Sequence, residues 1–397
     1  MKIQILVTFF SRFGSAAAGF VIAILLSQFL GAEGKGQASL LILNISFINL
    51  LTNVMGGSAV VFLAPRYSAF TLLVVSYIWV PVSALLLWAL YMVSGYTFTS
   101  LNHHTFILAT LLGFFQTNTN LLLGKKQTHT FNILSLAQVL LTLTYLLVAL
   151  YSPVASKNYN QYVYALYCGY GLSFIASLYY ANKEINEYLV ADVKEVISKF
   201  IKHGGYLQLA NLGQLLIYRA SFYIIGYYHQ LPPLGIYSNA IAIAESIWIV
   251  SRSISTVQYA EVANETDIKV SMQKTARLRW INVAIATGLT LLVCLLPDGL
   301  YTLLFGKEFK GLQEIIWWLA PGILAFSYYT ITTHFFAGIG KNHYNTIISF
   351  TGFGLTVVLG MILIPAYSAI GAAITASMVY LLNTLQAEYY YRKLSKG

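Results

Sequence analysis

A few charged side chains lie inside otherwise apolar segments, and they are the residues best suited to bind a ligand. Arg219 lies in the middle of NLGQLLIYRASFYIIGYY, and Glu245 and Arg252 lie seven residues apart on one face of the next segment. In a helix that spans a bilayer, a central charge costs about 2.5–3.5 kcal/mol on insertion scales and usually marks a functional site. A guanidinium stays ionised and offers a planar fork of donors to phosphate oxygens. Arg219 is therefore the first candidate for binding an anion, Arg252 the second, and Glu245 a candidate for ion coupling.

Other polar residues share the helical face of Arg219. At 100° per residue, Gln208, Asn211, Arg219, Tyr223 and Gly226 fall within an arc of about 120°. This face is predicted to line a cavity, with the polar side chains contacting a ligand. The alternative is that Arg219 holds two helices together through backbone carbonyl groups.

Three further candidate residues lie in the first sixth of the chain. Asn49 and Asn53 form a polar stripe that either hydrogen-bonds a sugar or joins helices. Arg12 shares a helix face with small residues, so it either faces a cavity or reaches back to the membrane surface. All three are included among the candidate substrate-binding residues.

No pattern in the chain predicts catalysis. Phosphate-binding lysine motifs, nucleophile elbows and paired carboxylates are missing from the sequence, and its histidines lack metal-ligand spacing. Cys168 and Cys294 stand singly in apolar runs, which indicates neither a metal site nor a disulfide. We therefore expect no enzyme activity, no metal and no cofactor.

The composition predicts a membrane protein. Of 397 residues 58% are hydrophobic and 9% charged, against about 25% charged in an average soluble domain. Apolar runs reach the ~20 residues that a helix needs to cross the hydrocarbon. The net charge of +10 indicates topology rather than nucleic-acid binding, because the charges are spread between the spans instead of gathering on one face.

Charged and turn-rich breaks divide the chain into twelve predicted spans. Because Arg12 interrupts the first apolar stretch, we expect a membrane span there rather than a cleaved secretory signal. The predicted spans are 5–30, 38–63, 70–95, 104–123, 131–152, 160–181, 205–228, 234–256, 280–304, 312–338, 343–364 and 369–390.

The positive charges support this count. If the N-terminus is cytoplasmic, only four of the 23 lysines and arginines, Lys35, Lys157, Lys307 and Lys310, fall in outside loops. Two more lie within spans, and all the others fall on the inside, as the positive-inside rule requires. Both termini are therefore predicted to be cytoplasmic.

The two halves of the chain resemble each other. GKGQASLLI resembles PLGIYSNAIAI, with Gly36 and Gly235 in equivalent places, and GKKQTHTFNILSL resembles GKNHYNTIISF. We therefore predict an all-α integral membrane protein of about 12 transmembrane helices, in two six-helix lobes with a central cavity. The lobes are 1–181 and 205–397, joined by a charged cytoplasmic linker at 182–204, which is the plan of many transporters.

Three local patterns resemble the polysaccharide-exporter branch, which includes the O-antigen flippases, of the multidrug/oligosaccharidyl-lipid/polysaccharide (MOP) superfamily. They are FLGAEGKGQASLL, YRASFYIIGYY followed by LGIYSNAIAIAE, and LLFGKEFKG. The resemblance implies a flippase that moves undecaprenyl-pyrophosphate-linked oligosaccharide repeat units across the bacterial cytoplasmic membrane by alternating access. Where relatives often carry an acidic residue just after the arginine, this chain has Ser221 and Phe222, and it has Gln28 where an arginine is frequent.

The resemblance also implies partners and rival functions. The expected partners are the lipid-linked oligosaccharide, the bilayer and the polysaccharide polymerase machinery, and nucleic acid is not among them. A multidrug or small-molecule cation antiporter of the same superfamily is the alternative, although it would carry acidic residues in its cavity and only Glu245 qualifies. A membrane scaffold would leave the intramembrane charges unexplained, and LAPRYSAF stands where a major-facilitator transporter has its glycine-rich basic loop.

Overall fold

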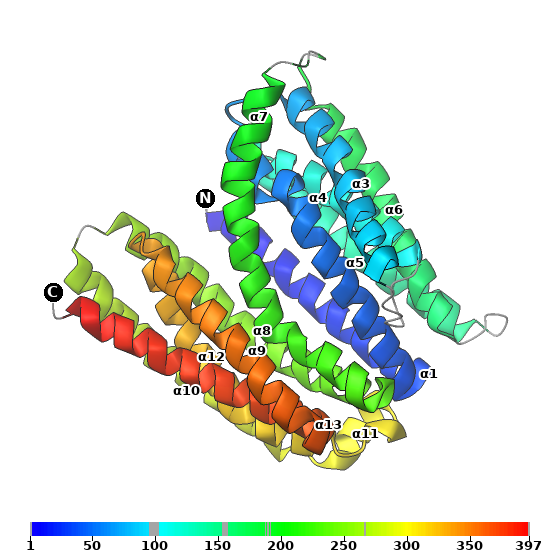
Figure 1. Ribbon diagram of the computed structural model, residues 1–397, viewed down its shortest axis with the longest axis vertical. Coiled ribbons are helices and arrows are strands. Elements are labelled where there is room, and N and C mark those ends of the chain that lie inside the picture. The colour runs from blue at the N-terminus through cyan, green and yellow to red at the C-terminus, as the bar shows by residue number, and fades with distance from the viewer. Residues whose placement is uncertain are drawn as a thin grey trace. The chain divides into compact units, whose positions relative to one another are not determined.

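The described part of the protein consists mainly of helices (Figure 1). The computed structural model describes residues 2–94, 103–152, 158–186, 188, 190, 192–265 and 267–395, and these contain no strand. The chain forms two compact units, one of Met1–Leu30 with Gln37–Leu212, the other of Gly31–Gly36 with Gly213–Gly397. The short segment Gly31–Gly36 therefore packs with the second unit, although its neighbours in the sequence belong to the first.

The first unit is a bundle built mainly on α4 and α6. Its helices are α1 (Lys2–Gly56), α2 (Ser58–Leu63), α3 (Ala69–Ser94), α4 (His103–Gly124), α5 (Thr128–Tyr151), α6 (Tyr159–Asn182), α7 (Val193–Phe200) and the start of α8 (Tyr206–His229), which follows a π-helical turn at Ile201–Gly205. α6 packs against α4 and α5, and α3 packs against α4. Leu41, Leu108 and Leu146 are completely buried in the resulting core.

The segment predicted as a charged linker contains a packed helix. On α7, Val196 and Phe200 are completely buried and belong to the hydrophobic cluster that includes Ala181. The hydroxyl of Tyr67 donates a hydrogen bond to Glu195 Oε1 at 2.6 Å, and this bond raises the pKa of that hydroxyl. The charges of this segment thus lie on the outer face of an amphipathic helix whose apolar face joins the first unit.

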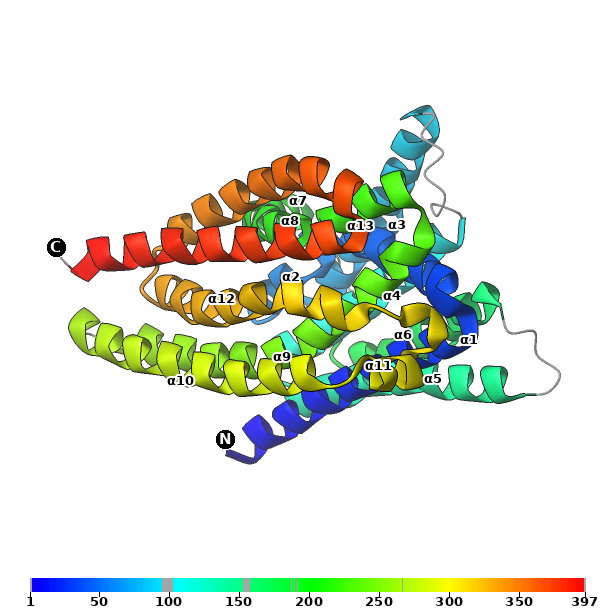
Figure 2. The same cartoon turned by 90° about the horizontal axis from the view of Figure 1, so that it is seen from below.

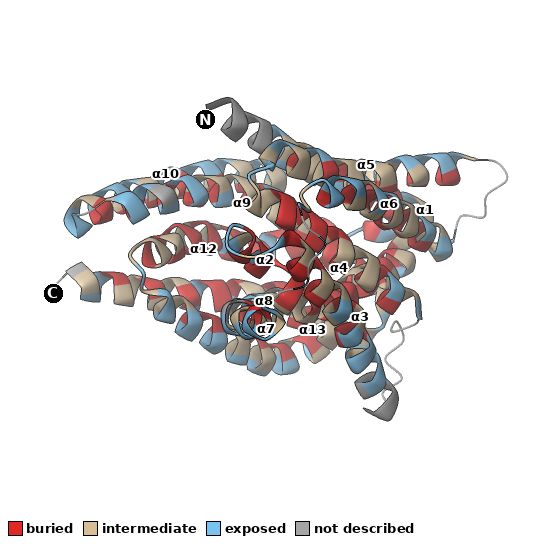
Figure 3. Cartoon of the chain, turned by 90° about the horizontal axis from the view of Figure 1, so that it is seen from above, coloured by how far each residue is buried: buried red, intermediate tan, exposed pale blue. Residues whose placement is uncertain are grey.

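The second unit is built around α12. Its helices are the rest of α8, α9 (Leu231–Asn264), α10 (Ile268–Leu295), α11 (Asp298–Phe305), a 3₁₀ turn (Lys307–Phe309), α12 (Leu312–Gly338) and α13 (Asn342–Ser395). α12 packs against α9, α10 and α13 (Figure 2). Most of its residues are buried, as the red positions along it show in Figure 3.

The helices account for the twelve predicted spans. Eight helices in the described part of the chain are long and apolar enough to cross a membrane. Two of them, α1 and α13, are bent at a single non-helical residue, Gly31 and Ser368, and each provides two spans. α6 and α8 are less apolar, but each has 24 residues and is thus ~36 Å long. The prediction of an all-α membrane protein with six spans in each half is confirmed.

The prediction of a loop between the eighth and ninth spans was wrong. The predicted inside loop at 257–279 is mostly helical, because α9 continues to Asn264 and α10 begins at Ile268. The two extensions bind each other through a hydrogen bond from Gln258 to Thr275 at 2.8 Å and an ion pair between Lys274 and Glu265 at 3.3 Å. Hydropathy indicates where a span leaves the membrane. It does not indicate where the helix ends, because polar side chains outside the membrane can stabilise further helical turns.

Large apolar side chains cover the outer faces of several helices. Leu292 and Leu295 on α10, and Met361 and Ile362 on α13, are more than half exposed. Contiguous apolar surface of this kind is rare on soluble monomers and normal where lipid is the solvent. The exposed faces therefore agree with a multi-pass membrane protein.

Candidate functional site

Arg219 on α8 and Glu245 on α9 form an ion pair. Arg219 Nη2 lies 2.8 Å from Glu245 Oε1, and the two side chains are 25% and 35% exposed. The carbon of the guanidinium is also 4.8 Å from the centre of the Phe222 ring. Because the pair is neither fully buried nor fully exposed, its charges are accessible to a third charged group.

Two buried aromatic residues lie beside this ion pair. Phe222 and Tyr237 are each 1% exposed, and their rings meet edge to face with centroids 5.5 Å apart. Tyr237 is hydrogen-bonded to Ser221 and interacts electrostatically with both members of the pair. Ser221 and Phe222 are both buried, and they pack α8 against Tyr237 of α9.

A close crossing of two helices lies in the same unit. A Cβ atom at Gly36 would collide with the carbonyl oxygen of Leu231, and one at Gly235 would collide with that of Ala32. Leu231 lies four residues before Gly235, and Ala32 lies four residues before Gly36, so the two contacts are equivalent. This symmetry is expected where two similar segments cross about a local two-fold axis. Glu308 Oε2 accepts a hydrogen bond from the backbone N–H of Ala32 at 2.7 Å, which fixes the bend of α1.

This crossing buries Lys35. Lys35 is only 8% exposed, and it interacts electrostatically with Arg219 and Glu245. The sequence analysis placed it in an outside loop and did not include it among the site residues. The sequence feature that could have indicated its burial is the glycine that follows it, Gly36, because a Cβ atom there would collide with Leu231.

The structure does not bring Arg252 to the pair. Arg252 is exposed on α9, two turns beyond Glu245, which is ~10 Å along the helix axis. Its guanidinium carbon lies 5.9 Å from the centre of the Phe326 ring. Tyr223, four residues after Arg219 on α8, is half-buried.

The polar face predicted on one helix is divided between the two units. Gln208 and Asn211 belong to the first unit, and Arg219 and Tyr223 to the second, because the unit boundary falls after Leu212 within α8. Asn211 Nδ2 donates a hydrogen bond to Gln208 Oε1 at 3.1 Å, so these two amides interact with each other. Gln208 is buried and Asn211 is exposed.

The candidate residues on α1 lie in the first unit and have different surroundings. Asn49 is buried, and its Oδ1 accepts a hydrogen bond from Thr52 at 3.1 Å, which supports helix packing. The Oδ1 atom of Asn53 is buried and has no hydrogen-bond partner among the described residues, so it is free to accept a bond from a ligand. Arg12 is exposed, and it forms no ion pair with the described residues.

A second charged cluster was not predicted. Arg279 on α10 lies 2.7 Å from Glu388 on α13, which also pairs with Arg392 at 2.7 Å and accepts a hydrogen bond from Tyr328 on α12 at 2.9 Å. The Arg279 side chain is 5% exposed, and its guanidinium lies over the Tyr391 ring at 4.0 Å. This cluster joins three helices through the carboxylate of Glu388, so it contributes to their packing.

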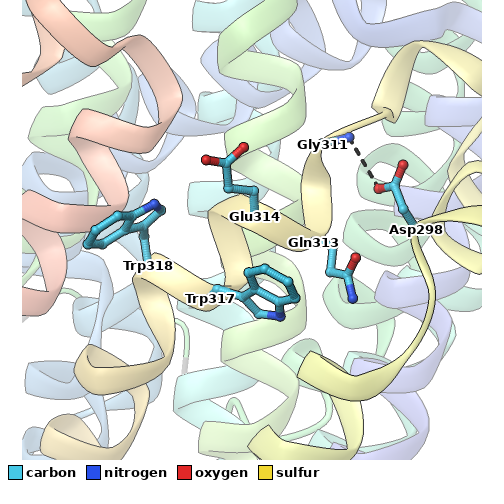
Figure 4. A pocket seen from close by; sticks show the side chains of 6 residues that line it. All are labelled: Asp298, Gly311, Gln313, Glu314, Trp317 and Trp318. Carbon is cyan, nitrogen blue, oxygen red and sulfur yellow. Dashed lines mark hydrogen bonds between the residues drawn. The ribbon is translucent and has the colours of Figure 1, made fainter.

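A pocket of about 520 Å³ lies where α12 begins (Figure 4). It is lined by Asp298, Gly311, Gln313, Glu314, Trp317 and Trp318. Asp298 Oδ1 accepts a hydrogen bond from the N–H of Gly311 at 3.2 Å, and Trp317 donates one to the carbonyl of Cys294 at 2.9 Å. Tryptophans near a span end are typical membrane-interface anchors. No three His, Cys, Asp or Glu side chains of the described residues gather to hold a metal ion.

Two curated proteins are similar to parts of the chain. No family model matches it. The chain is 21% identical over 205 residues to an uncharacterised membrane protein of Methanocaldococcus jannaschii, an alignment that covers 51% of this chain and 40% of that protein. It is 28% identical over 169 residues to the capsular polysaccharide biosynthesis protein CapF of Staphylococcus aureus, covering 41% of each. Both alignments thus span about two fifths of the relative's length.

Solved structures match almost the whole chain. An inward-facing multidrug resistance MATE family transporter of the MOP superfamily has a TM-score of 0.73 and 13% identity, covering 96% of both chains. The chain has the fold of MOP superfamily transporters. The lipid II flippase MurJ in an inward closed conformation has a TM-score of 0.70 and 15% identity, covering 99% of this chain and 88% of that one. The first of these proteins is thus a transporter and the second a flippase.

Proposed function

We propose that the protein is a flippase that moves undecaprenyl-pyrophosphate-linked oligosaccharide repeat units across the bacterial cytoplasmic membrane by alternating access, for O-antigen, capsule or exopolysaccharide synthesis. The observation that carries the proposal is the partly exposed guanidinium of Arg219, held by Glu245 in the middle of a membrane-spanning helix. A diphosphate is polar and doubly charged, so crossing a membrane requires cations that replace its water. The similarity to CapF and the fold shared with MurJ agree with a lipid-linked substrate.

Arg219 binds the pyrophosphate in this proposal, and Glu245 is its counter-ion when the substrate is absent. Arginine suits the task because its fork forms two parallel hydrogen bonds to phosphate oxygens. Glu245 is also the proposed ion-coupling residue, because an ion that binds its carboxylate would release Arg219 to the substrate. Arg12 and Arg252 are secondary phosphate contacts.

The remaining candidate residues contact the sugars. Gln208, Asn211, Asn49 and Asn53 offer amides, and Tyr223 offers a hydroxyl, which are groups that hydrogen-bond sugar hydroxyls. The buried Asn53 oxygen without a protein partner is the strongest of these. The polyprenyl tail stays in the lipid while the head group passes through the protein.

The proposed setting follows from the positive-inside pattern. Both termini lie in the cytoplasm, the protein lies in the bacterial inner membrane, and its product on the outer side is consumed by the polysaccharide polymerase machinery. Lobe limits of 1–181 and 205–397, with the linker at 182–204, belong to the same proposal.

A multidrug or small-molecule cation antiporter is less well supported. Such a transporter needs a carboxylate that is available to a cation. Glu245 is the acidic residue in the middle of a predicted span, and it is paired with Arg219 at 2.8 Å. A cation would have to displace a guanidinium that is tethered beside the carboxylate, whereas an anion is attracted to that guanidinium.

The test is glycan export in a bacterial strain that lacks the gene and is complemented with variants. Arg219→Ala is expected to abolish export, and Arg219→Lys to retain part of it, because lysine keeps the charge but loses the fork. Arg392→Ala removes an exposed arginine of the same unit and is the control. Membrane levels are matched by blotting. Full export by Arg219→Ala would refute the proposal, and loss of that variant from the membrane would show that Arg219 serves helix packing.

A further inference from the structure

The pocket at the start of α12 combines two carboxylates with two tryptophan rings (Figure 4). Its volume of about 520 Å³ lies within the usual range of ligand sites, roughly 300–1,000 Å³. Glu314 precedes Trp317 by three residues and Trp318 by four, so its side chain neighbours both rings on the helix surface. Asp298, at the start of α11, lines the same space. The proposed function uses none of these residues.

Most side-chain N–H groups of this pocket are engaged by the protein. The amide nitrogen of Gln313 donates to the backbone carbonyls of Cys294 at 3.1 Å and Leu296 at 2.7 Å. The indole of Trp317 donates to the same Cys294 carbonyl at 2.9 Å. The indole N–H of Trp318 is the one donor of the lining side chains that has no acceptor among the described residues.

The acceptor groups of the pocket remain available. Glu314 is exposed and forms no hydrogen bond or ion pair with the described residues. Asp298 accepts the N–H of Gly311 with one oxygen and leaves the other without a partner in the described part of the chain. A ligand in this pocket therefore meets mainly acceptor oxygens and aromatic faces, which suits a group that donates several hydrogen bonds.

The pocket is also negatively charged. The N-terminus of α12 contributes a partial positive charge of roughly half an elementary charge, which does not neutralise two carboxylates. Lys307 and Lys310 in the preceding turn are exposed, do not line the pocket and form no ion pair with the described residues. A calcium ion takes six to eight oxygen ligands, and aromatic rings instead attract organic cations.

We propose that this pocket binds a primary ammonium group. The three N–H bonds of the ammonium are donated to the carboxylates of Glu314 and Asp298 and to the amide oxygen of Gln313, and the tryptophan faces attract its charge. The start of α12 is predicted to lie at the outer surface of the membrane, where ethanolamine phospholipids and free amines both present this group. The proposal does not depend on the proposed transport function.

The experiment measures lipid binding to the purified full-length protein in detergent by native mass spectrometry. The probes are phosphatidylethanolamine, phosphatidylcholine and phosphatidylglycerol with the same acyl chains. The wild type is expected to bind phosphatidylethanolamine about ten- to a hundredfold more tightly than phosphatidylglycerol, the range of one charge-assisted hydrogen bond. Phosphatidylcholine should bind with intermediate affinity, because its methylated ammonium keeps the attraction to the rings but has no N–H to donate.

Two variants locate the binding. Glu314→Gln keeps the shape of an exposed side chain and is expected to lose most of the preference for phosphatidylethanolamine. Glu261→Gln is the matched control, because Glu261 is an exposed glutamate of α9 in the same unit and does not line the pocket. Trp318→Leu removes one ring and is expected to weaken the binding of phosphatidylethanolamine and phosphatidylcholine alike.

Ethanolamine added as a competitor identifies the source of the ammonium. Displacement of phosphatidylethanolamine by millimolar ethanolamine would show that a free amine suffices, and no displacement would assign the pocket to the lipid head group. Equal binding of phosphatidylethanolamine and phosphatidylglycerol by the wild type would overturn the proposal. An unchanged preference in Glu314→Gln, or tighter binding of phosphatidylcholine than of phosphatidylethanolamine, would overturn it as well.

Discussion

Gly31 and Gln230 have the same unusual backbone conformation at equivalent positions of the two halves. Their φ and ψ angles are 68° and −171° for Gly31, and 64° and −161° for Gln230. Each residue lies five positions before the crossing glycine of its half, Gly36 or Gly235. The sequence similarity between the halves therefore extends to a local backbone geometry that the residue types alone do not reveal.

Replacing Gln230 with glycine is expected to stabilise the protein. This backbone region is essentially restricted to glycine and costs other residues of order 1–3 kcal/mol. The flexibility of glycine in the unfolded chain offsets about 0.5–1 kcal/mol of the gain. The apparent Tm of Gln230→Gly in detergent should therefore rise. Gln127→Gly is the control, because Gln127 precedes a helix with an ordinary φ of −80°, and an unchanged or lower Tm for Gln230→Gly would contradict the expectation.

Gly235→Ala is expected to lower the folded fraction strongly. The added Cβ atom would collide with the backbone oxygen of Ala32, which cannot move away as a side chain does. Gly288→Ala is the matched control within a helix, since a Cβ atom there meets nothing within 4 Å. Size-exclusion profiles and apparent Tm values of the two variants measure the difference. Equal behaviour would show that the glycine crossing is not needed for folding.

Exchanging the members of the ion pair separates a structural role from a binding role. Arg219→Glu combined with Glu245→Arg restores opposite charges between α8 and α9, so the double variant is expected to reach the membrane at the wild-type level. Export should stay lost, because the guanidinium then projects from α9 instead of α8 and no longer meets the substrate phosphate. Recovery of export in the double variant would assign the pair to helix packing. Membrane levels and glycan export are measured in the same cells.

Glu245→Gln is expected to remove the pH dependence of export. A glutamine imitates the protonated carboxyl group, so Arg219 remains available to phosphate at every pH. Export rates between pH 5 and pH 8 in proteoliposomes measure this. A variant with normal export and an unchanged pH profile would exclude coupling through Glu245.

The predicted topology is tested by labelling single cysteines in a variant without Cys168 and Cys294. Lys307→Cys is expected to react with an impermeant thiol reagent added to whole cells, because Lys307 is exposed and its turn is predicted to lie outside. Lys126→Cys should react only after the membrane is permeabilised. Labelling of Lys126→Cys in intact cells would reverse the orientation.

The sequence predicts the spans well because the thickness of the bilayer requires a long apolar run. The predicted span 312–338 coincides with α12. Helix ends outside the membrane are less predictable, since partners such as Gln258 and Thr275 come from different helices. The ion pair of Arg219 with Glu245 was within reach of sequence analysis, because both residues are charges inside spans.

Lys35 was missed for a physical reason. Counting residues places it between two spans, where a lysine is normally solvated. Its burial follows from the contact of Gly36 with Leu231, about two hundred residues later in the chain. A contact of that kind leaves no periodic pattern in the sequence. The lobe limits 1–181 and 205–397 stay a prediction.

The hydrogen bond between Ala32 and Glu308 has a consequence for synthesis, because its partners are 276 residues apart. At 5–20 residues per second, the ribosome needs roughly 14–55 s to add that length of chain. During this time the first two spans are already made, but the bend at Gly31 has neither its carboxylate nor its glycine partner. Lys35 is then on the nascent protein without Arg219 and Glu245. The first half of the protein is therefore synthesised before the second half supplies the hydrogen bond and the helix contact that hold the bend at Gly31.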